Sequence, residues 1–109
     1  MNTIEIPFSR EMAIAAIEGR KVATTRSEPK GEIGDIFSIK NPQIPNNPSY
    51  GHFCLIEILD AQLETVRDFY FRLEGFDSPS EFVKTWKALH RGHFVPDKWY
   101  YMHVFGRVV

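Results

Sequence analysis

The sequence predicts an α+β fold, a mostly antiparallel β-barrel with helices packed at its ends. The predicted elements run in the order strand, helix, strands, two short helices and strand. After the first helix, only residues 61–97 are long enough for a helical crossover, which disfavours a doubly wound parallel sheet. The 109 residues fit one domain spanning 1–109, and 43% hydrophobic content can supply a buried core.

The first elements follow from an alternating segment and a capped apolar stripe. Ile4, Ile6 and Phe8 alternate with polar residues or proline, which predicts a half-buried strand at the start of the chain. Ser9 is a suitable N-cap for a helix that ends at Gly19. The predicted buried stripe of that helix consists of Met12, Ala13, Ala16 and Ile17.

Two further strands are predicted in the middle of the chain, over Asp35–Lys40 and Gly51–Asp60. The apolar residues of the second strand fall on both of its faces, so we expect both faces to be covered. These residues are Phe53, Leu55 and Leu59 on one face, and Cys54, Ile56 and Ile58 on the other. The segment 41–49 contains three prolines and three asparagines and is predicted to be a loop that borders the ligand cleft.

The C-terminal part predicts two helices and a strand. Helical spacing of Val66, Phe69, Tyr70 and Leu73 indicates a short helix that stops at Glu74-Gly75-Phe76. The run Ser78-Pro79-Ser80-Glu81 combines a capping box with proline at the first helical position, which marks a second helix start. Trp99–Val108 is a final strand rich in aromatic residues. The second helix should bury Phe82, Trp86 and Leu89.

Charge and composition narrow the class of protein. The net charge is −1, whereas a protein that neutralises many phosphates usually has a basic surplus. Cys54 is the only cysteine, Met1–Phe8 has no continuous apolar run, and no apolar stretch reaches the roughly 18–20 residues that span a bilayer. We therefore expect a cytoplasmic protein without membrane contact, either a monomer or a small homo-oligomer.

One connecting segment concentrates polar chemistry. Arg20, Lys21, Thr24, Thr25 and Arg26 occupy seven residues between the first helix and a strand. Three cations and two hydroxyls suit an anionic or polar ligand, although a solvated basic loop is an equally good interpretation. The pair His90-x-x-His93 has ligand-like spacing, but only Asp97 stands near it in sequence, so neither a metal nor a cofactor is predicted.

These segments carry a family resemblance. The run Gly19-Arg20-Lys21-x-x-Thr24-x-Arg26, the pair Gly34-Asp35, the element Glu74-Gly75-Phe76 and the Phe82…Trp86 helix together resemble the ASCH domain. The resemblance covers Ile4 to Phe105. It implies a pseudouridine-synthase-and-archaeosine-transglycosylase-like (PUA-like) barrel, with a cleft between barrel and helices that receives RNA or a modified nucleoside.

The resemblance also implies an activity. A small bacterial branch of similar length consists of amidohydrolases that remove acyl groups from the exocyclic amine of cytidine, using a Lys, Thr and Glu trio. The matching positions are Lys21, Thr24 and Glu74. The resemblance therefore predicts a metal-independent amidohydrolase whose partner is a small modified nucleoside or base.

Amide hydrolysis requires a nucleophile, a proton acceptor and a partner for the oxyanion. Thr24 would be the nucleophile, and Lys21 its base if desolvation lowers the lysine pKa. Glu74 would orient Lys21 or carry the proton to the leaving amine. Because alternate strand residues face the same side, Lys21 and Thr24 can cooperate only if their segment bends. Substrate contacts are expected from Arg20, Thr25, Arg26 and Phe76.

Two other functions use the same basic segment. One is a non-catalytic module that binds single-stranded RNA, and the other is a weak ribonuclease. Structural explanations also exist, because Lys21 suits the negative end of the first helix and threonines suit any strand. The near-neutral charge favours the small-molecule ligand, and the resemblance as a whole favours RNA.

Overall fold

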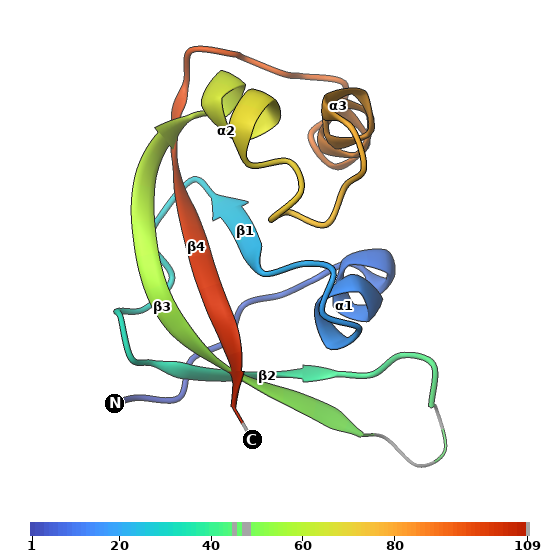
Figure 1. Ribbon diagram of the computed structural model, residues 1–109, viewed down its shortest axis with the longest axis vertical. Coiled ribbons are helices and arrows are strands. Elements are labelled where there is room, and N and C mark those ends of the chain that lie inside the picture. Colours follow the sequence, from blue (N-terminus) through green and yellow to red (C-terminus); the bar gives the residue numbers. More distant parts are fainter. Residues whose placement is uncertain (45, 47–48, 109) are drawn as a thin grey trace.

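The structure is a computed structural model that describes residues 1–44, 46 and 49–108. Its elements are α1 (Arg10–Ile17), β1 (Ala23–Arg26), β2 (Ile36–Lys40), β3 (Tyr50–Gln62), α2 (Leu63–Phe69), α3 (Pro79–Leu89) and β4 (Trp99–Val108). The strands form one antiparallel sheet in the order β1-β4-β3-β2, which curls into a half-barrel (Figure 1). The α+β class and the antiparallel sheet are confirmed. The barrel is open, because β1 and β2 are the two edges of the sheet.

The long β3–β4 pair forms the centre of the sheet and contains a β-bulge between Leu55 and Glu57. An extra residue in one strand moves the following side chains to the opposite face. Leu55 and Leu59 therefore do not share a face, and Ile58 joins Leu55 in the core instead. The prediction that both faces of this strand are covered is wrong, because Ile56 is 55% and Leu59 38% exposed.

The prediction of a strand at the start of the chain, over Ile4, Ile6 and Phe8, is also wrong. Thr3 forms a single isolated bridge with Ile36, and Ile4 donates its N–H to the Ile36 carbonyl at 2.8 Å. The burial alternates as expected, since Ile6 is buried between exposed neighbours. Pro7 has no N–H for a sheet ladder. The segment therefore leaves the sheet and continues towards α1 as an extended chain.

The helix starts agree with the capping signals. The Ser9 hydroxyl accepts a hydrogen bond from the Met12 N–H, and the Ser78 hydroxyl accepts one from the Glu81 N–H. The α2 helix begins and ends earlier than predicted, because it continues directly from β3 and buries Leu63 and Val66. Three residues assigned to buried helix faces are exposed: Phe69 at 77%, Leu73 at 36% and Leu89 at 60%.

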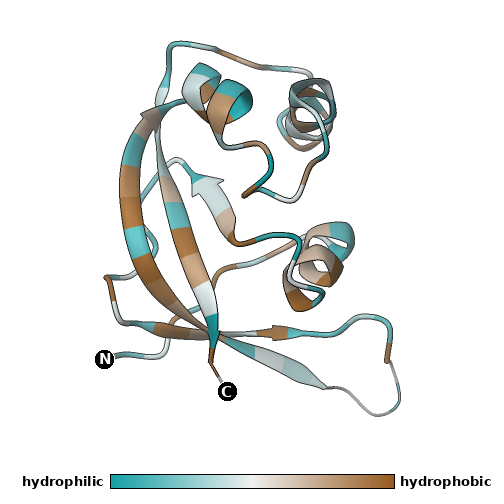
Figure 2. Cartoon of the chain, in the orientation of Figure 1, coloured by the Kyte–Doolittle hydropathy of each residue, from teal (hydrophilic) through white to brown (hydrophobic). Residues whose placement is uncertain are grey.

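Two separate hydrophobic clusters stabilise the fold, and Figure 2 shows hydrophobic positions along β3 and β4 that supply both. The first cluster lies between α1 and one end of the sheet. It consists of Ile6, Ala13, Ala16, Phe37, Ile39, Phe53, Leu55 and Phe105. The second lies between α2, α3 and the other end, where the two helices sit together in Figure 1. It consists of Ala61, Leu63, Val66, Phe82, Trp86 and Tyr100.

None of the helices in the described ranges combines the length and apolar character that a membrane span requires.

Part of the loop predicted to border the ligand cleft, residues 45, 47 and 48, lies outside the described residues. At its near end, the Pro42 carbonyl accepts a hydrogen bond from Arg10 at 3.0 Å.

Candidate active site

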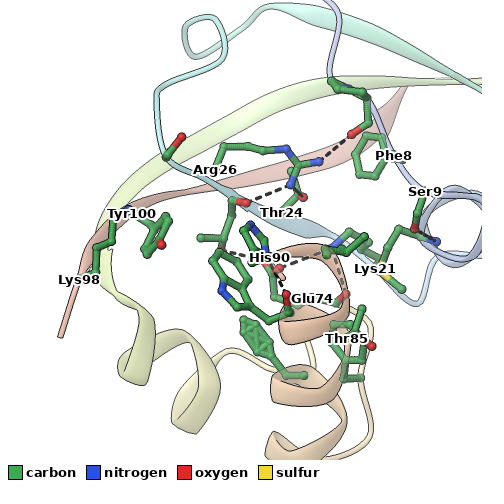
Figure 3. A pocket seen from close by; sticks show the side chains of 18 residues that line it. Phe8, Ser9, Lys21, Thr24, Arg26, Glu74, Thr85, His90, Lys98 and Tyr100 are labelled. Atoms are coloured by element: carbon green, nitrogen blue, oxygen red, sulfur yellow. Dashed lines mark hydrogen bonds and ion pairs between the residues drawn. The ribbon is translucent and has the colours of Figure 1, made fainter. Parts of the chain in front are cut away.

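A cavity of about 620 Å³ lies between the two hydrophobic clusters. Phe8 and Met12 line it from the side of the first cluster, and Phe82 and Trp86 from the side of the second. The middle of its wall is polar and is contributed by the segment that contains β1 and by the turn between α2 and α3. Figure 3 shows the side chains of Lys21, Thr24, Arg26 and Glu74 gathered there.

Lys21 and Glu74 form a buried ion pair across this wall. The Lys21 Nζ lies 3.5 Å from Glu74 Oε1, with side-chain exposures of 3% and 6%. The same Nζ donates a hydrogen bond to the Glu74 carbonyl at 3.1 Å. Lys21 precedes β1, so its direction is not set by strand alternation. Two residues 53 positions apart are thus joined through both side chain and backbone.

The turn that carries Glu74 is docked on the start of β1. The Leu73 carbonyl accepts from the N–H groups of Val22 and Ala23, at 2.8 and 2.9 Å. Gly75 has a φ of 97°, and a Cβ at this position would lie 3.1 Å from the Lys21 Cβ. Glycine avoids both the strained conformation and this contact. The Glu-Gly-Phe element therefore brings the backbone close enough for Glu74 to reach Lys21.

The two adjacent threonines have different partners. The Thr24 hydroxyl accepts a short hydrogen bond from Arg26 Nη1, while the Thr25 hydroxyl donates to Glu74 Oε2 at 3.2 Å. Both side chains are buried, at 1% and 4% exposure. Lys21, Thr24 and Glu74 line one cavity, but the hydroxyl in contact with the carboxylate belongs to Thr25. Lys21 and Thr24 are buried, so the solvated basic loop that the sequence left open does not describe these two residues.

Arg26 fixes the Thr24 side chain. Its Nη1 also donates to the Thr25 carbonyl at 3.0 Å, and its Nη2 donates to the Pro7 carbonyl at 2.8 Å. The guanidinium lies 5.5 Å from the centre of the Phe8 ring. Three of the five guanidinium N–H groups thus have protein acceptors. We infer that Arg26 orients Thr24 rather than acting mainly as a free substrate ligand.

His103 supports β1 from the neighbouring strand. Its Nε2 accepts the Lys30 N–H at 2.8 Å, and since an amide only donates, this nitrogen carries no proton. Its Nδ1 donates instead, towards the carbonyls of Thr24 and Tyr101 at 3.2 and 3.1 Å. The ring is therefore neutral and fully buried, and burial lowers the His103 pKa below 6.5.

Burial weakens the charged form of both members of the pair. Burial lowers the Lys21 pKa from its usual 10.5, an effect that Glu74 opposes and Arg26 reinforces. Burial likewise raises the Glu74 pKa above 4.5, opposed by Lys21 and by the Thr25 hydrogen bond. The neutral pair has the same net charge as the ion pair and differs from it only in which residue holds the proton. Both shifts are towards the neutral forms, which are the forms that a general base and a general acid require.

Aromatic side chains form the rest of the wall. Trp86 contacts Tyr100 edge-to-face at 5.0 Å and stacks in parallel on His90 at 4.0 Å between ring centres. Lys98 Nζ lies 5.1 Å from the centre of the Tyr100 ring. The sequence predicted that Trp86 is buried and that Tyr100 belongs to the aromatic-rich final strand, but it did not identify His90 or Lys98 as cavity residues. The four-residue spacing of Trp86 and His90 was the available signal.

Most of the predicted site residues line the cavity, and one does not. Six line the cavity: Lys21, Thr24, Thr25, Arg26, Glu74 and Phe76. Arg20 does not, because it follows the end of α1 on the surface and pairs with Glu18 at 2.6 Å, which corrects its assignment as a substrate ligand. Among the loop residues 41–49 that the structure describes, none lines this cavity. The described residues also contain no group of three His, Cys, Asp or Glu side chains placed to hold a metal ion.

These features define a class of protein, a PUA-like α+β fold in which helices and a curled antiparallel sheet enclose a buried polar cavity. No family model matches the sequence, and no curated protein does. The fold itself has solved counterparts.

One counterpart is an ASCH domain from Lactobacillus crispatus, with a TM-score of 0.67 and 15% identity, covering 97% of this chain and 78% of that one. Another is a protein from Enterococcus faecalis of the family DUF984, with a TM-score of 0.64 and 19% identity, covering 98% and 75%. The chain therefore has the ASCH-domain fold that the sequence resemblance predicted.

Proposed function

We propose that the protein is an amidohydrolase that removes acyl groups from the exocyclic amine of cytosine nucleosides. The observation that carries this proposal is the convergence of buried Lys21, Thr24 and Glu74 on one cavity. These are the residue types and motif positions that the resemblance to acylcytidine amidohydrolases requires. A volume of about 620 Å³ is also in the range of small-molecule sites.

In the first half-reaction, the Thr24 oxygen attacks the acyl carbonyl carbon and its proton passes to neutral Lys21. The Arg26 donor stabilises the Thr24 oxygen while its proton leaves, and the negative charge then passes to the former carbonyl oxygen of the tetrahedral intermediate. The carbonyl–nitrogen bond then breaks as protonated Glu74 gives its proton to the exocyclic nitrogen. The products are the free cytosine nucleoside and an acyl ester of Thr24.

The second half-reaction restores the site. Water attacks the ester carbonyl and loses its proton to the Glu74 carboxylate. The Thr24 oxygen leaves and takes its proton back from the Lys21 ammonium, while the carboxylic acid departs. Lys21 ends neutral and Glu74 protonated, as each began, so no metal or cofactor is needed to balance the cycle.

The remaining wall suits a flat heterocycle. Phe76, Trp86 and Tyr100 present apolar ring surface beside the polar group of Lys21 and Glu74. Aromatic rings bind planar ligands through offset-stacked or edge-to-face contacts. A cytosine ring against these aromatics would place its acylated amine towards the polar wall.

The test is to incubate the purified protein with N4-acetylcytidine and measure released cytidine. We expect hydrolysis by the unaltered protein and a loss of at least about a hundredfold in Thr24→Val, which keeps the shape but removes the nucleophile. Thr25→Val makes the same change one residue away and should retain part of the activity, because it only loosens Glu74. Arg20→Ala is the control outside the cavity.

Full hydrolysis by Thr24→Val would show that Thr24 is not the nucleophile. An unaltered protein that binds single-stranded RNA but releases no cytidine would favour the non-catalytic module. In that case Thr24→Val should leave RNA binding almost unchanged, because a buried hydroxyl contributes little to phosphate binding.

A further inference from the structure

A second hollow of about 410 Å³ adjoins the cavity at Trp86. Five residues line both spaces: Trp86, Leu89, His90, Lys98 and Tyr100. Figure 3 shows Lys98 and Tyr100 on one side of the cavity, away from Lys21 and Ser9 on the other. The two spaces are therefore adjacent, and a ligand that occupies both would place its reactive group near Lys21 and its other end beside Lys98.

Every ionisable side chain in the second hollow, apart from the Tyr100 phenol, is basic. His90, Arg91, His93 and Lys98 line it, and among the residues that the structure describes no Asp or Glu does. We call this surface the basic groove. The salt bridges found within the described ranges involve neither Arg91 nor Lys98. Their charges are thus available to an anion from solvent.

The backbone around the basic groove is consistent with a binding surface. Arg91 has a φ of 56°, the left-handed conformation that commonly ends a helix at the residue after its C-cap, which here is His90. The negative end of α3 would repel an anion, but its carbonyls already have donors. Gly92 donates to the Lys87 carbonyl at 2.7 Å, and His90 Nδ1 donates to the Trp86 carbonyl at 2.8 Å.

We propose that the substrate is a phosphorylated cytosine nucleoside, with its base in the cavity and its phosphate bound by His90, Arg91, His93 and Lys98 in the basic groove. This inference rests on the proposed function for the identity of the base. The phosphate can come from a mononucleotide or from the terminal nucleotide of an RNA strand, since both present the same anion. The net charge of −1 and the small size of the basic groove favour the mononucleotide.

The test measures binding of reaction products, so it does not depend on turnover. Calorimetry at low salt compares cytidine, cytidine 5′-monophosphate and a short oligonucleotide that ends in cytidine. We expect the monophosphate to bind at least about tenfold more tightly than cytidine, the typical effect of one charge-assisted contact. The difference should shrink as salt is raised, because solvent-exposed charges are screened.

The location is tested by Arg91→Ala combined with Lys98→Ala, which should remove most of the ratio between monophosphate and cytidine affinities. The matched control is Lys84→Ala combined with Lys87→Ala, which removes the same charge from exposed positions of α3 outside both spaces. This control should keep the ratio. If both double variants lower the ratio equally, the effect is one of net charge and the basic groove is not the phosphate site.

The outcomes separate this inference from the proposed function. Equal binding of cytidine and its monophosphate, or binding of neither, overturns the phosphate site. Much tighter binding of the oligonucleotide, lost in the Arg91/Lys98 variant, supports the site and assigns its phosphate to RNA. Phosphate-dependent binding without any hydrolysis of acylated cytidine or its monophosphate supports the basic groove while the amidohydrolase proposal fails.

Discussion

The aromatic cluster packed against α1 and the Lys21–Glu74 wall of the cavity are both buried, but opposite kinds of side chain build them. In the first, Phe37 contacts Phe53 and Phe105 at 5.6 and 5.3 Å between ring centres. In the second, Lys21 and Glu74 are buried to a similar degree. Burial of the rings stabilises the fold, whereas removing two charges from water costs free energy that their attraction only partly offsets.

This difference indicates which region has a purpose other than stability. A buried ion pair is weak evidence for stabilisation, because an apolar pair of similar volume often does as well or better. Perturbed pKa values in a cavity are typical of functional sites. The contrast therefore predicts that changes in the aromatic cluster should lower stability, and that changes in the cavity should lower activity.

The largest expected effect is on stability. Phe37→Ala removes a fully buried ring with three aromatic neighbours and leaves a void, so the free energy of unfolding should fall by about 3–5 kcal/mol. Urea denaturation would measure this change. Any variant protein that remains folded should keep its turnover per folded molecule. A loss of turnover at full stability would remove the contrast between the two regions.

The next effect is on turnover. Lys21→Ala and Thr24→Val should each lower hydrolysis of acylated cytidine by at least about a hundredfold, as expected for a base and a nucleophile. Together they should cost little more than either alone, because parts of one catalytic unit are not additive. Steady-state kinetics on the three variants checks this. Independent, multiplying losses would mean that the two residues do not act in one step.

Much of the aromatic cluster was predictable from sequence, because hydrophobic periodicity marks which residues face inwards. The buried Phe53 and Leu55 follow from strand alternation, and the capping signals locate α1 and α3. Alternation failed where the sheet has a bulge, since a one-residue insertion at Ile56 leaves no local signal and places Ile58, rather than Leu59, against the first cluster. Pro7 similarly ended a strand pattern that its neighbours otherwise supported.

The site was predictable only through the motif resemblance. Composition could not distinguish a solvated basic loop from a buried polar wall, and it suggested no link between Lys21 and Glu74 across 53 residues. That link depends on backbone contacts of the turn with β1, which are tertiary. Arg20 and Lys21 illustrate the limit of prediction from composition. These two cations are adjacent in the sequence, but Arg20 is exposed and Lys21 is buried. His90 and Lys98 join the cavity only through packing of α3 against β4.

A smaller expected effect measures what the buried Lys21–Glu74 pair contributes to the free energy of unfolding. Lys21→Met combined with Glu74→Leu replaces both charges by apolar side chains of similar length. We expect the free energy of unfolding to stay equal or rise by about 1–2 kcal/mol, with hydrolysis abolished. Thermal and urea denaturation, together with the cytidine assay, measure both quantities. A clear loss of stability in this double variant would show that the pair mainly holds the fold together.

The smallest effect concerns His103, the neutral ring behind β1. Its folded-state pKa lies below 6.5 because it is buried, so the unfolded chain binds the proton more readily. The stability that the neutral His103 ring contributes is therefore fully present above pH 6.5 and is lost as pH falls through the folded-state pKa. The slope of the free energy of unfolding against pH is at most about 1.4 kcal/mol per pH unit for one group.

His103→Gln isolates the pH-dependent stability that comes from His103. Glutamine can still accept a hydrogen bond from the Lys30 N–H through its carbonyl, but it cannot gain a proton. The Lys21–Glu74 pair holds one proton in either form, as the two residues together do in the unfolded chain near neutral pH. It therefore adds little slope in this range, and it is unchanged in the variant. Urea denaturation from pH 7 downwards should give a steeper loss of stability for the unaltered protein than for the glutamine variant. Parallel curves would mean that the ring is protonated in the folded state, and hence that Lys30 is not its donor.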